Sequence, residues 1–229
     1  MGKKILVVQS RITPNRIENE RDNYRRSVGE LAQTDFLSAV DEKLAWTSPA
    51  EFLKGYGGVI FGGSSDFDFH GGRMENDPAR IMSMLILSRA KHIVSYALEC
   101  GVPVLGICFG HQIIGNMHSG MVSNDREQSK FGAYMVKLTE AGKTDPLFSA
   151  LPEEFWAQYA HKDSVTNLPE GATLLATGET CRFAALRYAD KVYTMQFHPE
   201  VRRFVHGPKS HDSPEASRLI PLWIEHIVG

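Results

Sequence analysis

Short, continuous runs of hydrophobic residues mark the first half of the chain. Polar or amphipathic stretches separate three such runs, at 4–8, 57–61 and 104–107. Runs of this kind are typical of strands buried on both faces of a parallel sheet. A weaker strand is expected at 35–40, an exposed helix at 19–30 and a long helix at 81–99, with Gly101 as its C-cap. Ser48, Pro49 and Glu51 have the spacing of a further helix start.

The pattern changes after Gly120. Short strand-like segments now alternate with turns that contain Gly, Pro or Asp, at 134–138, 155–160, 172–177, 182–186 and 192–197. A last helix is expected at 214–228, with Ser213 as its N-cap and Pro221 as a kink or break. We therefore predict a three-layer α/β fold in one domain over 1–229, with a mostly parallel central sheet flanked by helices and additional antiparallel strands in the second half.

Composition and charge exclude several classes of protein. The chain has 229 residues, 42% of them hydrophobic, and is long enough to bury one full core. Its formal net charge is −2 and its basic residues are scattered, which argues against nucleic acid or a membrane surface as a partner. The apolar windows are too short to cross a bilayer, and the N-terminus lacks the features of a signal peptide.

The three cysteines, Cys100, Cys108 and Cys181, are widely spaced and form no C-x-x-C motif. This favours a reduced, cytoplasmic protein and argues against a zinc site or a disulfide framework. No spacing in the sequence implies a metal or an organic cofactor. The histidines without evident chemistry show no paired ligand spacing and are interpreted as surface or loop residues: His70, His92, His118, His206 and His211.

Cys108 has the surroundings of a reactive thiol. It directly follows the run 104–107 and precedes helix-compatible residues. Gly106 and Gly110 flank it, which is the nucleophile-elbow spacing with sulfur in place of oxygen. The N-terminus of a helix stabilises an anion there, and the N–H of Phe109 points to where an attacked carbonyl oxygen becomes negative. The alternative is a buried structural cysteine at a strand–helix junction.

Two other strand ends carry candidate groups. Gly62 and Gly63 follow the run 57–61, where paired glycines let backbone N–H groups approach a ligand, although an ordinary turn is an equal alternative. The next segment, 66–80, is too long for a typical strand-to-helix loop, and such loops are often lids or binding segments. Because ligands bind at the carboxyl ends of strands in open α/β sheets, these groups would converge with Cys108.

His198-Pro199-Glu200 supplies a base and a carboxylate. Pro199 cannot donate a ladder hydrogen bond and therefore sits at or just past a strand end. In extended backbone, residues two apart project to the same side, so Glu200 comes within reach of the His198 ring. A thiol nucleophile needs such a pair. His111 is a rival base without an evident orienting carboxylate, and a zinc-deaminase interpretation of H-x-E lacks its P-C-x-x-C partner.

The segments GICFGHQ and QFHPEV together closely resemble the class I, or triad-type, glutamine amidotransferase domain family, in particular stand-alone members like the glutaminase part of GMP synthase. Supporting matches are GVIFGG, HKDSV, AALRY and PLWIEH, and the resemblance runs from about Lys4 to the end. It implies a flavodoxin-like fold. Thr194, Lys130 and the Ser64-Ser65 pair depart from the family pattern, which has a glycine, an acidic residue and a proline there.

The resemblance implies a role for each matching residue. Cys108 would attack the side-chain amide of glutamine to give a γ-glutamyl thioester and ammonia, while His198 would act as base and then acid, oriented by Glu200. The N–H groups of Gly63 and Phe109 would form the oxyanion hole. The substrate-binding positions would be Gly62, Gln112, His161, Lys162 and Asp163.

The resemblance also implies partners and alternatives. The substrate would be glutamine or another γ-glutamyl compound, and ammonia would pass to a separate synthase or acceptor subunit or be lost. Family members also include γ-glutamyl peptidases, which cut amide bonds to larger amines that the loop 66–80 could accommodate. A catalytically silent regulatory or binding subunit is a further alternative.

Overall fold

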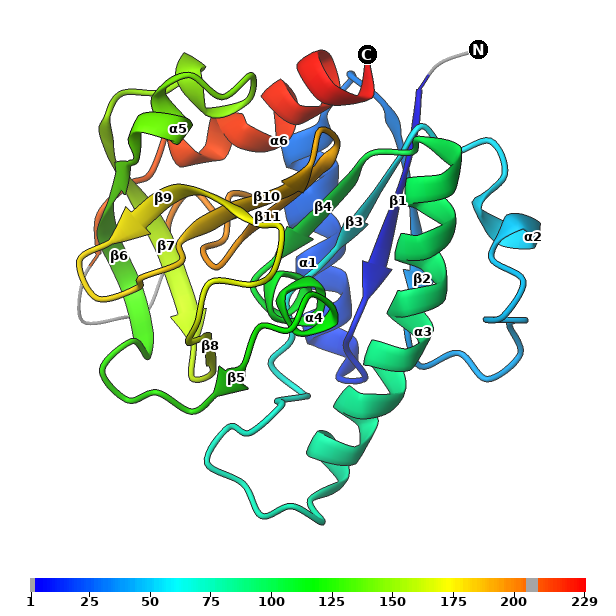
Figure 1. Cartoon of the computed structure of the whole chain (residues 1–229). Coiled ribbons are helices and arrows are strands. Elements are labelled where there is room, and N and C mark those ends of the chain that lie inside the picture. Colours follow the sequence, from blue (N-terminus) through cyan, green and yellow to red (C-terminus); the bar gives the residue numbers. More distant parts are fainter. Residues whose placement is uncertain (1–2, 205–209) are drawn as a thin grey trace.

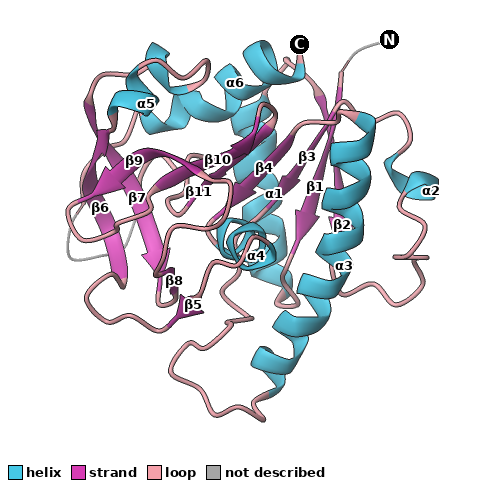
Figure 2. Ribbon diagram, viewed as in Figure 1, coloured by secondary structure: helices cyan, strands magenta, loops and turns pink. Residues whose placement is uncertain are grey.

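A nine-stranded mixed sheet runs through the middle of the protein (Figure 1). The structure is a computed structural model that describes residues 3–204 and 210–229. The strands lie in the order β2-β1-β3-β4-β11-β10-β9-β6-β7. Helices cover both faces of the sheet (Figure 2), which confirms the three-layer α/β fold predicted from the sequence.

The first five strands of this order are parallel: β2 (Gln33–Ser38), β1 (Lys4–Gln9), β3 (Gly58–Phe61), β4 (Val104–Ile107) and β11 (Val192–Met195). Their carboxyl ends share one edge of the sheet. At that edge Phe61 pairs with Gly106, and Gly106 pairs with Thr194. The chain segments that follow β3, β4 and β11 therefore begin next to one another.

The other strands continue the sheet with antiparallel pairing: β10 (Ala185–Ala189), β9 (Thr173–Gly178), β6 (Lys130–Leu138) and β7 (Glu154–His161). A separate two-stranded sheet joins β5 (Val122–Ser123) to β8 (Ser164–Val165). Strands were expected in all these regions except 122–123 and 164–165, and β10 starts three residues later than the sequence pattern predicted. The mixed character of the sheet is thus confirmed.

Alternate residues of the parallel strands face two separate hydrophobic clusters. In β1, Ile5 and Val7 pack toward α1 (Pro14–Val28) and α6 (Leu219–Trp223), whereas Leu6 and Val8 face α3 (Pro78–Cys100) and α4 (Phe109–Met117). A strand that is buried on both faces must be apolar at consecutive positions, which explains the continuous runs in the sequence. Gly101 caps α3 in the left-handed region, as expected.

Helix α1 differs from its prediction in two respects. It begins at Pro14 and not at Asn19, because the fixed backbone angle of proline suits the first helical turn. It is also not fully exposed, since Glu20, Tyr24 and Val28 form a buried stripe at four-residue spacing. The polar composition of this segment concealed the stripe.

Two predicted helix caps are wrong. Helix α2 (Ala50–Leu53) starts after Pro49 and has no side-chain cap from Ser48. The Ser213 hydroxyl donates to the carbonyl of Arg202 at 2.9 Å and so ties down the preceding segment. Pro221 lies inside α6 and does not break it. A 3₁₀ turn at Ala216–Arg218 precedes α6, and a π-helical turn at Ile224–Val228 follows it.

The short helix α5 (Glu140–Lys143) packs against β9 and is capped by the Thr139 hydroxyl. Within the described ranges, the structure contains no helix with the length and apolar character needed to span a membrane.

Candidate active site

Cys108 occupies a sharp turn between β4 and α4. Its backbone lies in the left-handed region, with φ of 52°, a conformation that costs a non-glycine residue about 1–3 kcal/mol. Its N–H donates to the carbonyl of Met195 at 2.8 Å, and its own carbonyl accepts from the N–H of Gln112 at 3.1 Å. Both sides of the turn are therefore fixed, and the predicted strand–turn–helix arrangement is present.

The glycines on either side of Cys108 are required by close contacts. A Cβ at Gly106 would lie 2.8 Å from the carbonyl oxygen of Gly110, and a Cβ at Gly110 would collide with the backbone of Phe61. Any side chain at these positions would push α4 away from β3 and β4. The Gly-x-Cys-x-Gly spacing thus reflects packing at the turn.

His198 and Glu200 form a close pair just beyond β11. Nδ1 of His198 lies 2.6 Å from Oε1 of Glu200, and both side chains are buried. The N–H of His198 donates to the carbonyl of Gln158 on β7 at 2.8 Å, which fixes the backbone. With Nδ1 committed to the carboxylate, the other ring nitrogen is left for a second partner.

Cys108, His198 and Gly63 meet at one point. A Cβ at Gly63 would lie 2.9 Å from Cε1 of His198 and 3.5 Å from Cβ of Cys108. Three segments that are distant in the sequence, after β3, β4 and β11, therefore converge at the sheet edge. The absence of a side chain at Gly63 is what lets the histidine ring approach the cysteine.

The electrostatics of this cluster favour a charged histidine. Burial lowers the pKa of His198, but the Glu200 carboxylate and the Cys108 sulfur outweigh that effect and raise it to about 10. Nε2 of His198 is buried, and the structure pairs it with no nitrogen or oxygen of the described residues. The arrangement therefore suits an imidazolium beside the Cys108 sulfur.

His111, the rival base, is placed elsewhere. Its Nδ1 lies 2.8 Å from Oγ1 of Thr194, and it is fully buried. Burial, together with the neighbouring His161, lowers the pKa of His111 to about 3. It is neutral at physiological pH and makes no contact with a carboxylate among the described residues, so the geometry favours His198.

Two backbone N–H groups at the turn are available to a ligand. Phe109 is the first residue of α4, so its N–H has no acceptor within the helix. The N–H groups of Gly63 and Phe109 make no hydrogen bond to any described residue. The N–H of Gly62, in contrast, donates to the carbonyl of Val8 at 3.1 Å and is not available to a substrate.

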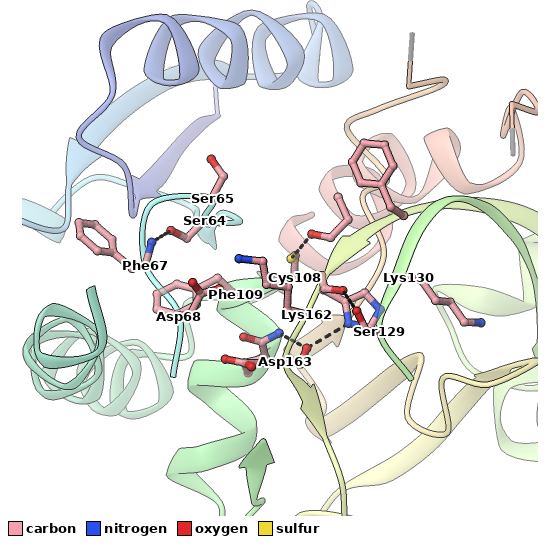
Figure 3. Close-up of a pocket in the computed structure, with 14 residues that line it drawn as sticks. Ser64, Ser65, Phe67, Asp68, Cys108, Phe109, Ser129, Lys130, Lys162 and Asp163 are labelled. Atoms are coloured by element: carbon pink, nitrogen blue, oxygen red, sulfur yellow. Dashed lines mark hydrogen bonds between the residues drawn. The ribbon is translucent and has the colours of Figure 1, made fainter. Parts of the chain in front are cut away.

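A cavity of about 400 Å³ opens in front of Cys108 (Figure 3). The turn after β3 forms one wall and the strand ends of β6 and β7 form the opposite wall. In Figure 3, Ser64, Ser65 and Phe67 lie on one side of Cys108, and Ser129 and Lys130 lie on the other. The cysteine sulfur is 3.9 Å from the carbonyl oxygen of Ala160.

Asp163, predicted to bind substrate, has its carboxylate engaged by the long loop. Its two oxygens each accept a hydrogen bond of 2.7 Å, from the N–H groups of His70 and Gly71. The loop is further braced by an ion pair of 2.8 Å between Arg73 and Asp68. The segment after Phe61 is thereby fastened to the far wall of the cavity, and Asp163 shapes the site through this loop.

The other predicted substrate positions differ in accessibility. Gln112 lines the cavity and donates to the carbonyl of Asp163 at 2.7 Å. His161 is buried, its Nδ1 lies 3.0 Å from the same carbonyl, and burial lowers its pKa to about 4. Lys162 is exposed at the cavity, so it is the cation best placed to meet an anionic group of a substrate.

Two of the departures from the family pattern, Thr194 and Lys130, have local explanations. Thr194 supplies the hydroxyl that contacts His111. Lys130 is buried, and its Nζ lies 4.5 Å from the ring centroid of Tyr134 and 5.1 Å from that of Tyr159. Its side chain points away from Cys108 in Figure 3. Lys130 therefore borders the cavity with its stem and directs its charge elsewhere.

A buried ion pair behind this site was not predicted from the sequence. Nε of Arg11, in the β1–α1 loop, lies 3.0 Å from Oε1 of Glu20 on α1. Within a polar segment, no local signal separates these two residues from the exposed charges around them. The only hint is the four-residue spacing of Glu20, Tyr24 and Val28, which becomes visible once the helix start is known.

Among the residues in the two described ranges, no group of three or more His, Cys, Asp or Glu could hold a metal ion. His206, interpreted from the sequence as a surface or loop histidine, lies outside those ranges.

Comparison with known proteins gives a consistent picture. A family model for glutamine amidotransferase class-I matches residues 68–212. The chain is 35% identical over 122 residues to a subunit of the glutamine-hydrolyzing GMP synthase of Methanocaldococcus jannaschii, covering 53% of this chain and 63% of that one. It is 31% identical over 156 residues to the corresponding subunit from Archaeoglobus fulgidus, covering 68% and 72%.

A solved structure supports the fold. The crystal structure of a candidate GMP synthase subunit from Thermoplasma acidophilum superposes with a TM-score of 0.71 at 21% identity, covering 99% of this chain and 94% of that one. The matched region spans 63% of the M. jannaschii chain and between 20% and 23% of several curated proteins named GMP synthase (glutamine-hydrolyzing).

Proposed function

Because the chain belongs to the class-I glutamine amidotransferase family, we propose that it hydrolyses the side-chain amide of glutamine and releases ammonia through a thioester on Cys108. The observation that carries this proposal is the convergence at Gly63. There the Cys108 side chain and the His198 ring approach one glycine, and the Glu200 carboxylate lies 2.6 Å behind the ring. This is the order nucleophile, base and orienting acid that acyl transfer requires.

In the first half of the reaction, the Cys108 thiolate attacks the amide carbon of glutamine. The negative oxygen of the tetrahedral intermediate accepts hydrogen bonds from the N–H groups of Gly63 and Phe109. The proton that the thiol gave to His198 then passes to the nitrogen, the C–N bond breaks and ammonia leaves. A γ-glutamyl thioester remains on the sulfur.

In the second half, His198 accepts a proton from water as the oxygen of that water attacks the thioester carbon. The C–S bond breaks, glutamate leaves and the proton is shared again between sulfur and imidazole. The Glu200 carboxylate orients the ring throughout and stabilises the imidazolium each time it forms, consistent with the raised pKa of His198. Glutamine and water are thus converted to glutamate and ammonia with no further reactant.

The ammonia acceptor is proposed to be a separate synthase subunit. Two curated relatives are each named as one subunit of a glutamine-hydrolyzing GMP synthase, which supports an arrangement with a second, acceptor-bearing chain. Ammonia formed by this chain alone would be lost to solvent. Addition of the partner is therefore expected to couple ammonia release to product formation.

The size of the cavity favours one further candidate, hydrolysis of larger γ-glutamyl compounds. Its volume of about 400 Å³ lies in the range of pockets that hold drug-sized ligands. The loop fastened by Asp163 forms part of its wall, where the amine leaving group of a γ-glutamyl peptide would extend. In this case the first product would be a larger amine in place of ammonia.

A panel assay tests both candidates. The purified chain is incubated with glutamine and with γ-glutamyl dipeptides, alone and with a GMP synthase subunit that lacks its own glutaminase, and ammonia, amine and glutamate are measured. Cys108→Ala is the matched control. Turnover of glutamine supports the amidotransferase, and turnover of dipeptides alone supports the peptidase. No turnover of either, with or without partner, would contradict both.

A covalent probe separates an enzyme from a silent subunit. A glutamine-like electrophile is expected to label Cys108 selectively, as followed by peptide mass spectrometry. Equal labelling of the exposed Cys100 and the buried Cys181 would favour the silent regulatory subunit.

A further inference from the structure

We propose that Arg11 is a positioning residue for the turn that carries the Gly63 N–H, and that it acts on the oxyanion hole from behind. This inference rests on the proposed function, since it concerns how the same site stabilises a tetrahedral intermediate. It is carried by contacts of the β1–α1 loop and α1, which lie outside the strand ends that hold Cys108 and His198.

Arg11 bonds the turn at Ser65 and lies beside it at Gly63. Its Nη1 donates to the hydroxyl of Ser65 at 2.7 Å. A Cβ at Gly63 would lie 3.6 Å from its Nη2, on the same side as the His198 ring. The planar guanidinium therefore spans the turn from Gly63 to Ser65, and its rigid fork suits this better than a single ammonium group would.

Glu20 supports both Arg11 and the preceding glycine. Its Oε1 lies 3.0 Å from Nε of Arg11 and would lie 2.9 Å from a Cβ at Gly62. Its other oxygen accepts from Nε2 of Gln9 at 2.9 Å. The Tyr24 hydroxyl, one helical turn later, would lie 3.4 Å from the same Cβ. Residues of α1 thus form the back wall of the Gly62–Gly63 turn.

Burial makes this pair a costly and specific arrangement. The side chains of Arg11 and Glu20 are 12% and 3% exposed, respectively. Burial raises the pKa of Glu20, and the Arg11 cation opposes that shift. A buried ion pair contributes little net stability compared with well-packed apolar residues, and its best-attested value is to specify one arrangement. Here the arrangement specified is that of the turn facing Cys108.

For catalysis, this means that the reactivity of the Cys108 sulfur and the stabilisation of the oxyanion depend on different residues. The thiolate–imidazolium pair depends on His198 and Glu200, whereas placement of the Gly63 N–H depends on Arg11. Loss of Arg11 should therefore slow reactions that pass through an oxyanion and leave simple alkylation of the thiolate unchanged, because alkylation forms no oxyanion.

The test compares Arg11→Met, Arg11→Lys and Arg11→Met/Glu20→Gln with the wild type. The double variant leaves no unpaired buried charge and so protects the fold. Arg25→Met is the matched control, since Arg25 pairs with Asp22 on the exposed face of α1. Two rates are measured: hydrolysis of the substrate found in the panel assay, and alkylation of Cys108 by iodoacetamide followed by peptide mass spectrometry.

We expect Arg11→Met and the double variant to lower kcat at least about tenfold, less than the 10²–10³-fold cost of deleting an oxyanion donor outright. KM and the alkylation rate should change less than about threefold, because these do not depend on the oxyanion. Arg11→Lys should recover part of kcat, since it keeps the charge opposite Glu20. Arg25→Met should match the wild type.

Two results would overturn the inference while leaving the proposed function intact. One is a double variant with the kcat of the wild type. The other is an alkylation rate that falls in parallel with kcat, which would show that Arg11 acts on the thiolate. If the wild type turns over no γ-glutamyl compound, the proposed function fails first and this inference fails with it.

Discussion

The surroundings of His198 and His111 form the most informative contrast in the molecule. Both residues are at most 5% exposed, and both lie near the carboxyl ends of β4 and β11. At His111 burial is the main influence, and the pKa falls to about 3. At His198 a carboxylate at 2.6 Å and a neighbouring sulfur reverse the effect of burial, and the pKa rises to about 10.

The difference teaches that the partner, and not burial or proximity in sequence, decides which histidine is charged. His111 is three residues from Cys108 along the chain, yet its ring bonds to Thr194. His198 is ninety residues away and is brought to Cys108 by the pairing of β4 with β11. A base chosen by sequence proximity would have been His111.

Removal of the nucleophile tests the foundation of this comparison. Cys108→Ala is expected to reduce hydrolysis to background, on the order of the 10⁶-fold loss known for a serine nucleophile. The fold should survive, because the change deletes only a sulfur atom. Activity assays and thermal unfolding by circular dichroism measure the two effects. Residual turnover well above background would place the nucleophile elsewhere.

Replacing each of the two histidines by asparagine tests the comparison directly. His198→Asn removes the proposed general base and acid and should lower kcat by about 10²–10⁴-fold. His111→Asn should alter stability more than kcat, because His111 contacts Thr194 and no reacting group. Steady-state kinetics of both variants decide the order. A larger loss in His111→Asn would make His111 the base.

Neutralisation of the carboxylate should make His198 resemble an ordinary histidine. A hydrogen bond to a charged group contributes about 1.5–3 kcal/mol, so Glu200→Gln should cost roughly 10- to 150-fold in kcat/KM. In the wild type the imidazolium persists up to the pKa of His198, about 10, and activity should decline above that pH. In the variant this basic limb should move to lower pH.

The corresponding pH–rate profiles are measured from pH 6 upward, with stability checked at each pH. An unchanged basic limb in Glu200→Gln would mean that the carboxylate does not set the proton affinity of His198.

The smallest expected effect concerns stability in acid. The unfolded chain protonates His111 near its ordinary pKa of 6.5, whereas the native chain does so only near 3. The unfolded state therefore binds more protons between these values, and the free energy of unfolding falls as pH falls through this window. His111→Asn lacks this contribution, so its acid sensitivity should be weaker.

Urea unfolding at pH 7 and pH 4.5 measures this difference, with His92→Asn on the exposed surface of α3 as control. His161, whose pKa is lowered to about 4, acts in the same direction and is present in all three proteins. If the wild type and His111→Asn lose the same free energy of unfolding between pH 7 and pH 4.5, His111 is not kept neutral by the fold.

The features found from sequence are those encoded locally. A glycine on each side of Cys108 and a proline between His198 and Glu200 define turns within a few residues, so their geometry could be inferred from the chain alone. The buried strands could be inferred because burial on both faces demands continuous apolar runs.

The features missed depend on distant packing. The Arg11–Glu20 pair is recognisable only when the start of α1 is known, and that helix begins five residues earlier than its polar pattern suggests. Asp163 matched a substrate-binding position by motif, but its carboxylate is taken by backbone groups that lie more than ninety residues earlier. The Ser213 hydroxyl was predicted to cap a helix, but it donates to the carbonyl of Arg202 instead.

The two hydrogen bonds between Asp163 and the loop after β3 bear on which positions of that loop can vary. Both donors to Asp163, at His70 and Gly71, belong to the main chain, so these two hydrogen bonds do not depend on the side chain at position 70. Gly71 and Gly72 are constrained in a different way, since their φ angles of 59° and 74° suit glycine best. The loop can thus tolerate substitution of His70 while its main chain stays bound to Asp163 and the reactive edge of the sheet keeps its shape.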